Sequence, residues 1–92
     1  MENQMGDRRD QMTPLPRFYL IEQRLKRGMS VEEVSRLIGI SNYYYYQIEN
    51  GRRGIKLTVP MSLLIIKALE LDALQFLQLE AEHARKYHEI ND

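Results

Sequence analysis

The sequence predicts an all-α fold of five helices. Apolar residues recur at helical spacing over most of the chain, and no segment shows the alternating pattern of a strand. Serine, threonine or aspartate stands before four of the helical segments, and glycine follows three of them. Because these residue types favour helix starts and ends, they mark the boundaries of the segments.

The first helix is expected over residues 17–27, directly after Pro14 and Pro16. Proline suits the entrance of a helix but not its interior, and Gly28 supplies the stop. Three apolar residues at positions i, i+3 and i+7 predict the buried face of this helix: Phe18, Ile21 and Leu25.

The second helix begins at a capping box, in which Ser30 is followed three residues later by Glu33. Gly39 ends it after about two turns. Its predicted apolar face consists of Val34, Leu37 and Ile38.

The third helix, over residues 42–50, contains four consecutive tyrosines. Ser41 is its N-cap, and Asn50-Gly51 ends it because both residues tolerate a left-handed backbone. Successive side chains on a helix are about 100° apart, so four in a row cannot all face the core. We expect Tyr45 and Ile48 to face inward and at least one other tyrosine to face solvent.

The fourth and fifth helices are expected after Thr58 and Asp72, with Pro60 in the first turn of the fourth. The fourth helix is predicted to be heavily buried through Leu64, Ile65, Ala68, Leu69 and Leu71. The fifth carries an apolar stripe of Leu74, Leu77, Ala81 and Ala84. Two interpretations of this end of the chain stay open. The stripe packs on the first and fourth helices, or the fifth helix joins a twofold partner through Leu77, Leu79 and Ala81.

The length of 92 residues suits one domain, predicted over residues 14–88. Residues 1–13 and 89–92 are polar and are expected to form a flexible tail and a frayed end. The chain has no cysteine, no apolar run of about 18–20 residues and no signal peptide, so a cytoplasmic, membrane-free protein is expected. His83 and His88 lack the spacing of metal ligands. We expect no metal, cofactor, small-molecule ligand or enzymatic activity.

The formal net charge is zero, but the charges are unevenly distributed. Residues 13–59 carry eight Lys/Arg against four Glu, whereas residues 60–92 carry three against six Asp/Glu. An asymmetry of this kind can direct a positive face toward phosphate.

The segment 28–51 resembles the XRE family of Cro and phage-repressor type helix-turn-helix proteins. Its ending, Ile48-Glu49-Asn50-Gly51, carries the most specific part of the resemblance. The run Ile65-Ile66-Lys67-Ala68-Leu69 resembles the fourth helix of that family, and the similarity extends over about residues 17–79. The family implies a five-helix fold, frequent dimerisation and a third helix that lies in the major groove of DNA.

By position, the resemblance assigns base contacts to Asn42, Tyr43 and Gln47, and sites near phosphate to Ser41 and Tyr44. The chemistry of the two amides agrees, because an amide can both donate to and accept from adenine in the major groove. Tyr46 shares the outward helix face. Three cations after the helix are expected to reach the DNA backbone: Arg52, Arg53 and Lys56.

The resemblance also pairs Arg24 with Glu49, which gives both residues a structural role. Two positions depart from the family pattern. Val31 replaces a glutamine that braces phosphate, so anchoring is expected from backbone amides or from Tyr44. Glu70 replaces the glycine that usually follows the fourth helix, so a different turn is expected there.

The sequence therefore predicts a sequence-specific DNA-binding transcriptional regulator, expected to be a repressor that binds a palindromic operator as a homodimer. Double-stranded DNA is the expected partner. The alternative is a protein-interaction module on the same fold, similar to an antitoxin or antirepressor, because tyrosine is enriched in protein interfaces.

Overall fold

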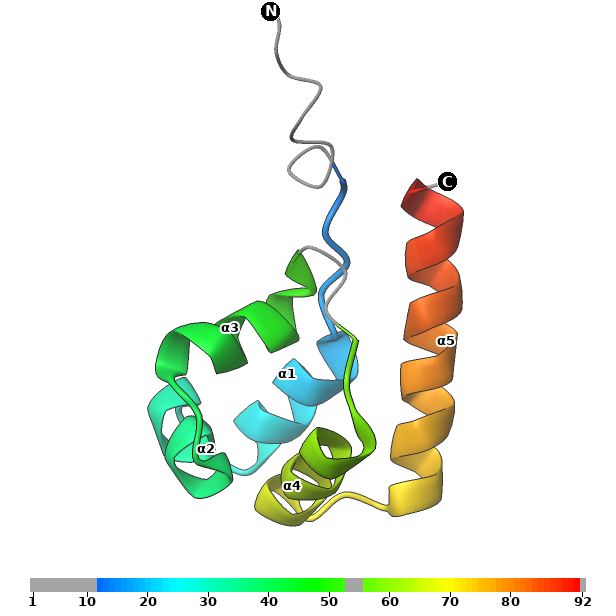
Figure 1. Ribbon diagram of the computed structural model, residues 1–92. Helices are drawn as coiled ribbons and strands as arrows, with labels where there is room; N and C mark the ends of the chain where they lie inside the picture. Colours follow the sequence, from blue (N-terminus) through cyan, green and yellow to red (C-terminus); the bar gives the residue numbers. More distant parts are fainter. Residues whose placement is uncertain (1–11, 53–55, 92) are drawn as a thin grey trace, which may run out of the picture.

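The computed structural model describes residues 12–52 and 56–91, which form five helices and no strand. In chain order the helices are α1 (Phe18–Lys26), α2 (Val31–Ile38), α3 (Asn42–Asn50), α4 (Val59–Leu69) and α5 (Ala73–Asn91). The first four gather into one body, and α5 stands alongside it (Figure 1). The prediction of an all-α, five-helix fold is confirmed.

The helices begin where their capping residues stand. Four side chains each accept a hydrogen bond from the backbone N–H three residues on: Ser30, Ser41, Thr58 and Asp72. At α2 the box is reciprocal, because Glu33 also accepts from the backbone of Ser30. These bonds satisfy N–H groups that have no partner within the helix.

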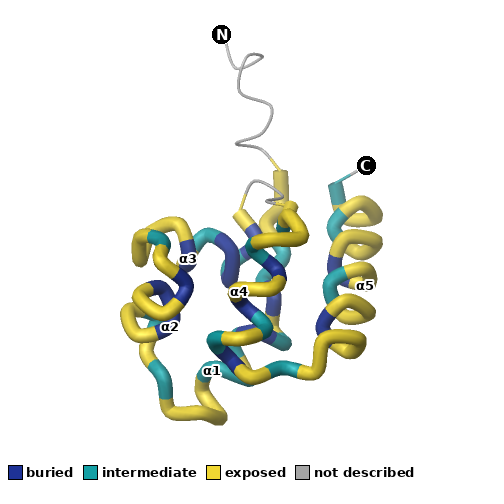
Figure 2. The backbone as a smooth tube through the Cα atoms, turned by 60° about the horizontal axis from the view of Figure 1, so that its bottom comes forward, coloured by how far each residue is buried: buried dark blue, intermediate teal, exposed yellow. Residues whose placement is uncertain are grey.

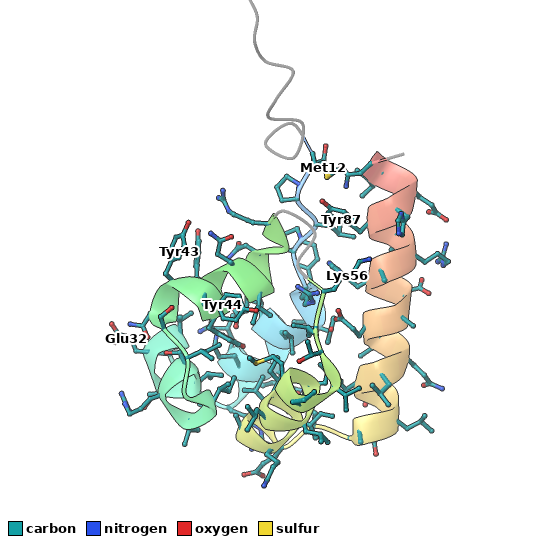
Figure 3. All side chains as sticks on the ribbon, viewed as in Figure 1. Met12, Glu32, Tyr43, Tyr44, Lys56 and Tyr87 are labelled. Atoms are coloured by element: carbon teal, nitrogen blue, oxygen red, sulfur yellow. The ribbon has the colours of Figure 1, made fainter. Side chains whose placement is uncertain are left out.

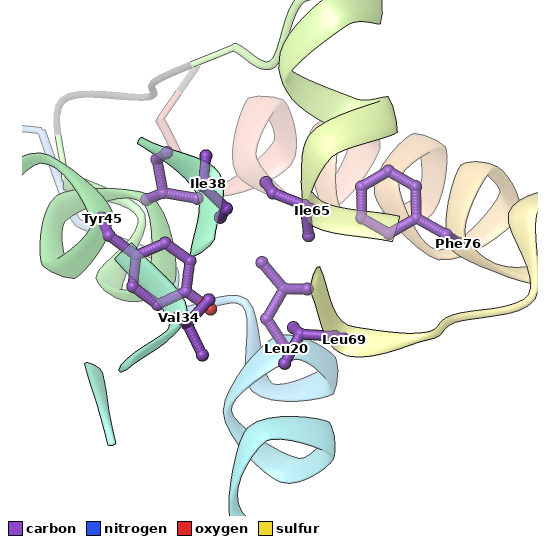
Figure 4. Close-up of a cluster of buried hydrophobic side chains, with 8 residues drawn as sticks. Leu20, Val34, Ile38, Tyr45, Ile65, Leu69 and Phe76 are labelled. Atoms are coloured by element: carbon purple, nitrogen blue, oxygen red, sulfur yellow. The ribbon is translucent and has the colours of Figure 1, made fainter. Parts of the chain in front are cut away.

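The core lies where α1, α2, α3 and α4 meet, and α5 contributes one aromatic ring to it (Figure 4). Its buried hydrophobic members are Leu20, Val34, Ile38, Tyr45, Ile48, Ile65, Leu69 and Phe76. Burial is concentrated on the facing sides of α2, α3 and α4, and the outer side of α5 is exposed along its length (Figure 2). Fully burying a large apolar side chain stabilises the fold by about 1.5–3 kcal/mol, so this cluster fixes the position of α3.

The predicted buried face of α1 is wrong. Phe18 and Leu25 are exposed, whereas Leu20 is fully buried. The helix turns its Arg17, Leu20 and Arg24 side toward the protein, and both arginines are ion-paired there. Charged side chains are rarely buried unless they are paired, so a pattern of apolar residues alone points to the wrong face.

Two further predicted core residues lie at the surface. Leu37 is exposed because α2 packs through Val34, Ser35 and Ile38, which lie on a different side of the helix. Leu64 is also exposed, because α4 packs through Ile65 and Leu69.

The apolar stripe of α5 does not pack on α1 and α4. Leu74, Leu77, Ala81 and Ala84 are exposed, and the helix instead turns Phe76 and His83 inward. The interpretation of the stripe as intramolecular core is therefore wrong. The sequence predicts a frayed tail over residues 89–92, but residues 89–91 belong to α5. Asn91 is held by two hydrogen bonds to the backbone of Thr13, at 2.7 and 3.0 Å.

Candidate nucleic-acid interface

Two short helices and a tight turn build the surface that the sequence singled out. Gly39 ends α2 with a left-handed backbone, φ 91°, and Ser41 starts α3 two residues later. Ile40 in the turn packs against the core. Because both helices are capped and share this buried link, α3 is held at a fixed angle to α2.

The four tyrosines of α3 divide between core and surface. Tyr45 is fully buried, whereas Tyr43, Tyr44 and Tyr46 are 70%, 40% and 45% exposed. Figure 3 shows Tyr43 directed away from the helical body. Exposed aromatic rings are costly in water unless they bind a partner. Three of them on one short helix therefore make this surface a candidate contact site.

The two predicted base-reading amides lie on α3 beside these rings. Asn42 is exposed, and its side-chain oxygen accepts a hydrogen bond from the hydroxyl of buried Ser35 on α2. The same hydroxyl, which has a single proton, also lies 3.0 Å from the carbonyl of Glu32. The contact holds the Asn42 amide beside α2, and the amide keeps both donor and acceptor capacity toward solvent. Gln47 is half-buried one turn further along. Ser41, Asn42, Tyr43 and Tyr46 are thus exposed at the start and along the outer side of α3, with Gln47 half-buried beside them.

A shallow hollow between the starts of α2 and α3 was not predicted. Its lining is aromatic and aliphatic with polar residues among it: Ser30, Val31, Glu32, Asn42, Tyr43 and Tyr46. Val31, one of the two departures from the family pattern, lines this hollow. The carboxylate of Glu32 gives the same region a negative charge, which opposes a phosphate at this end of α2.

The predicted backbone-contacting cations are spread out. Arg52 is exposed at the end of α3, and Arg53 lies outside the described residues. Lys56 is exposed but lines a groove beside α5, together with Leu57, Tyr87 and His88 (Figure 3). The structure therefore groups Arg52 with the end of α3 and places Lys56 nearer to α5.

Arg24 and Glu49 form the structural pair predicted from the sequence. Nε and Nη2 of Arg24 donate to the two carboxylate oxygens at 2.7 and 3.1 Å, and Nη1 donates to the carbonyl of Met29 at 3.0 Å. The hydrogen bond to Glu49 raises the pKa of Arg24. This two-pronged bond fixes α3 against α1, so it orients the exposed face without being part of it.

A second ion-paired arginine, which is fully buried, was not predicted from the sequence. Arg17 is 1% exposed, and it donates to both oxygens of Glu80 on α5, at 2.9 and 2.7 Å. It also donates to the carbonyl of Ile48 in α3, at 2.7 Å. Glu80 and Ile48 lie 63 and 31 residues away in sequence, so no local pattern could have indicated these contacts.

A family model described as helix-turn-helix matches residues 20–75, which include α2, α3 and α4. No curated protein matches the chain. In the described residues, each helix is too short or too polar to cross a membrane. Within the same residues, no group of three or more His, Cys, Asp or Glu could hold a metal ion.

Proposed function

Because this chain belongs to the XRE family of Cro and phage-repressor type helix-turn-helix proteins, which are DNA-binding regulators, we propose that it is a repressor. It binds a palindromic operator as a dimer and excludes polymerase by occupying the site. The observation that carries this proposal is the exposed face of α3, held rigid by two caps and the Arg24–Glu49 pair. This role requires no catalysis.

In this proposal the base contacts come from the first turns of α3. Asn42 and Gln47 read adenine through their amides, because an amide matches the donor and acceptor of that base in the major groove. The rings of Tyr43 and Tyr46, with Val31 behind them, form an apolar surface suited to the methyl group of thymine. A half-site containing both A and T is therefore expected.

The contacts to the DNA backbone come from residues around this face. Ser41 and Tyr44 supply hydroxyl groups near phosphate, and Arg52, Arg53 and Lys56 supply charge. Each cation that neutralises a phosphate steepens the salt dependence of binding by about one unit of logarithmic slope. These residues hold the protein on DNA without selecting a sequence.

Selection of bound sites from random duplexes, followed by a salt titration, tests the proposal. Recovery of a symmetric site with half-sites about 10 base pairs apart, or a multiple of that, is expected for a twofold dimer. The proposal fails if no duplex is retained even at low salt.

The two contact roles separate in a pair of variants. Gln47→Ala is expected to lose preference for the selected site, at a cost of about 1–3 kcal/mol of discrimination. Arg52→Ala is expected to weaken selected and scrambled duplexes alike. Binding curves on both duplexes measure the difference, and equal losses for both variants on both duplexes would contradict the assignment.

A protein-interaction module remains the second candidate, and one observation favours it. The hollow on the α3 face combines aromatic rings with the acidic Glu32, which suits a protein surface better than phosphate. The same duplex selection separates the candidates, since a protein-binding module would retain no DNA.

A further inference from the structure

The segment 12–17, here called the strap, lies between the end of α3 and the length of α5 (Figure 1). It contacts successive turns of α5. The thioether of Met12 accepts from the Tyr87 hydroxyl at 3.3 Å, and the carbonyl of Leu15 lies 2.6 Å from Nε2 of His83. The four α5 positions that hold the strap are Glu80, His83, Tyr87 and Asn91. Their spacing puts them on one side of the helix, so polar contacts dock this half of α5.

The other side of the strap meets the last turn of α3. The backbone N–H of Arg17 donates to the carbonyl of Glu49 at 2.7 Å, and its guanidinium donates to the carbonyl of Ile48 at 2.7 Å. The last carbonyls of a helix have no partner within it, and this end of the helix dipole favours a cation. Arg17 therefore caps the C-terminal end of the candidate recognition helix from another part of the chain.

The strap packs so closely against the end of α3 that no side chain fits at Gly51. Gly51, which follows α3 with φ 61°, faces the strap so closely that a β-carbon there would lie 1.9 Å from the carbonyl oxygen of Leu15. That same carbonyl is the partner of His83 on α5. One backbone group is thus enclosed between the end of α3 and α5.

Glu80 keeps Arg17 in this position. Its carboxylate receives two hydrogen bonds from the guanidinium and a third from the hydroxyl of Tyr19. A guanidinium as buried as Arg17 is stable only when its charge is compensated. If α5 moves away with Glu80, the guanidinium is drawn toward water and its hydrogen bond to Ile48 is lost.

We infer that Arg17 is a positioning residue for α3, and that the docking of α5 sets the geometry of the last turn of α3 through it. The link to DNA rests on the proposed function. Because coupling between two sites is reciprocal, DNA on α3 then strengthens the docking of α5, and release of α5 weakens DNA binding.

Amide hydrogen exchange on the free protein tests the coupling without DNA. Glu80→Ala is compared with Glu82→Ala, a matched change on α5 whose carboxylate pairs with Arg85 at 2.9 Å and not with the strap. We expect exchange in residues 48–51 to become faster in Glu80→Ala on the order of ten-fold, with residues 34–38 of α2 unchanged. Equal rates in the two variants, or the same acceleration throughout α2 and α3, would overturn the inference.

Binding to the selected duplex tests the consequence for function. Glu80→Ala is expected to bind the operator on the order of ten-fold more weakly than Glu82→Ala, with a smaller loss on a scrambled duplex. Affinity equal to that of the control would overturn the link to DNA. If the unmodified protein binds no duplex, the proposed function fails, and the exchange measurement still decides the coupling.

Two milder variants apply if Glu80→Ala does not fold. Glu80→Gln keeps the shape of the side chain and one acceptor oxygen but loses the charge. Arg17→Lys keeps the charge but loses the planar guanidinium, which donates to both Ile48 and Glu80. Both are expected to speed exchange in residues 48–51 selectively. Unchanged exchange in both variants would overturn the inference.

Discussion

Tyr45 carries a buried hydroxyl that has no hydrogen-bond partner among the described residues. An unsatisfied buried polar group costs about 1–3 kcal/mol, so this hydroxyl destabilises the core that its ring helps to form. Tyr19 differs, because its hydroxyl donates to Glu80. Replacement by phenylalanine is therefore expected to change stability in opposite directions at these two tyrosines.

Tyr45→Phe is expected to leave stability unchanged or to raise it by up to about 1 kcal/mol, because only the unpaired hydroxyl is lost. Tyr19→Phe is expected to lower it by about 1.5–3 kcal/mol, the contribution of a hydrogen bond to a charged group. Urea denaturation of both variants measures the difference. A destabilised Tyr45→Phe would show that its hydroxyl has a partner.

The pH dependence of stability follows from the same two residues. Burial and the nearby Glu49 carboxylate raise the pKa of Tyr45 above the ordinary value of 10.0. Burial together with the bond to Glu80 raises the pKa of Tyr19 in the same way. Groups whose pKa is raised on folding stabilise the protein fully below the unfolded pKa, and that contribution is lost at higher pH. Stability is therefore expected to fall above about pH 10. The fall should be smaller in Tyr45→Phe, and an identical profile would contradict this.

Among the helices, α4 is followed by a non-glycine residue in the left-handed conformation. Glu70 follows it with a left-handed backbone, φ 51°, and it is the one non-glycine residue with positive φ in the described chain. The sequence led us to expect a different turn here, but the structure keeps the left-handed conformation that glycine usually supplies. A side chain in this conformation costs about 1–2 kcal/mol.

Glu70→Gly is expected to raise stability, by up to about 1 kcal/mol after the greater freedom of glycine in the unfolded chain is subtracted. Glu70→Ala is the matched control, because it also removes the exposed Arg27–Glu70 ion pair at 3.3 Å but keeps the strain. Thermal unfolding of both variants measures the effect. A Glu70→Gly variant that is no more stable than Glu70→Ala would show that the turn is unstrained.

Helix ends could be predicted from the sequence, but helix faces only in part. A cap such as Ser30 or Ser41 acts within three residues, so its signal is local. The buried faces of α1 and α5 depend on distant partners: Arg17 is buried, and Glu80 half-buried, because the two form an ion pair. From the sequence alone, each of these two charged residues is expected at the surface. The exposed face of α3 was predictable because its core side, Tyr45 and Ile48, is apolar.

At the scale of the whole molecule, α5 leaves an apolar stripe without a partner in the described part of the chain. Leu74 and Leu77 are 66% and 53% exposed, and Ala81 and Ala84 continue the stripe along a groove beside Leu57. Contiguous exposed apolar surface marks interaction sites in folded proteins. A twofold partner on this helix would bury the stripe and place two α3 helices for a palindromic site.

Leu77→Asp is expected to abolish the proposed dimer, because a carboxylate in a buried apolar interface is left without compensation. Leu37→Asp is the matched control: the same change at a leucine of similar exposure, 62%, on α2 and away from α5. Sedimentation velocity is expected to show a monomer for the first variant and a dimer for the second, with both folded. Operator binding by Leu77→Asp should then become weaker and lose its cooperativity. A dimer that survives Leu77→Asp, or an unmodified protein that sediments as a monomer, would contradict association through α5.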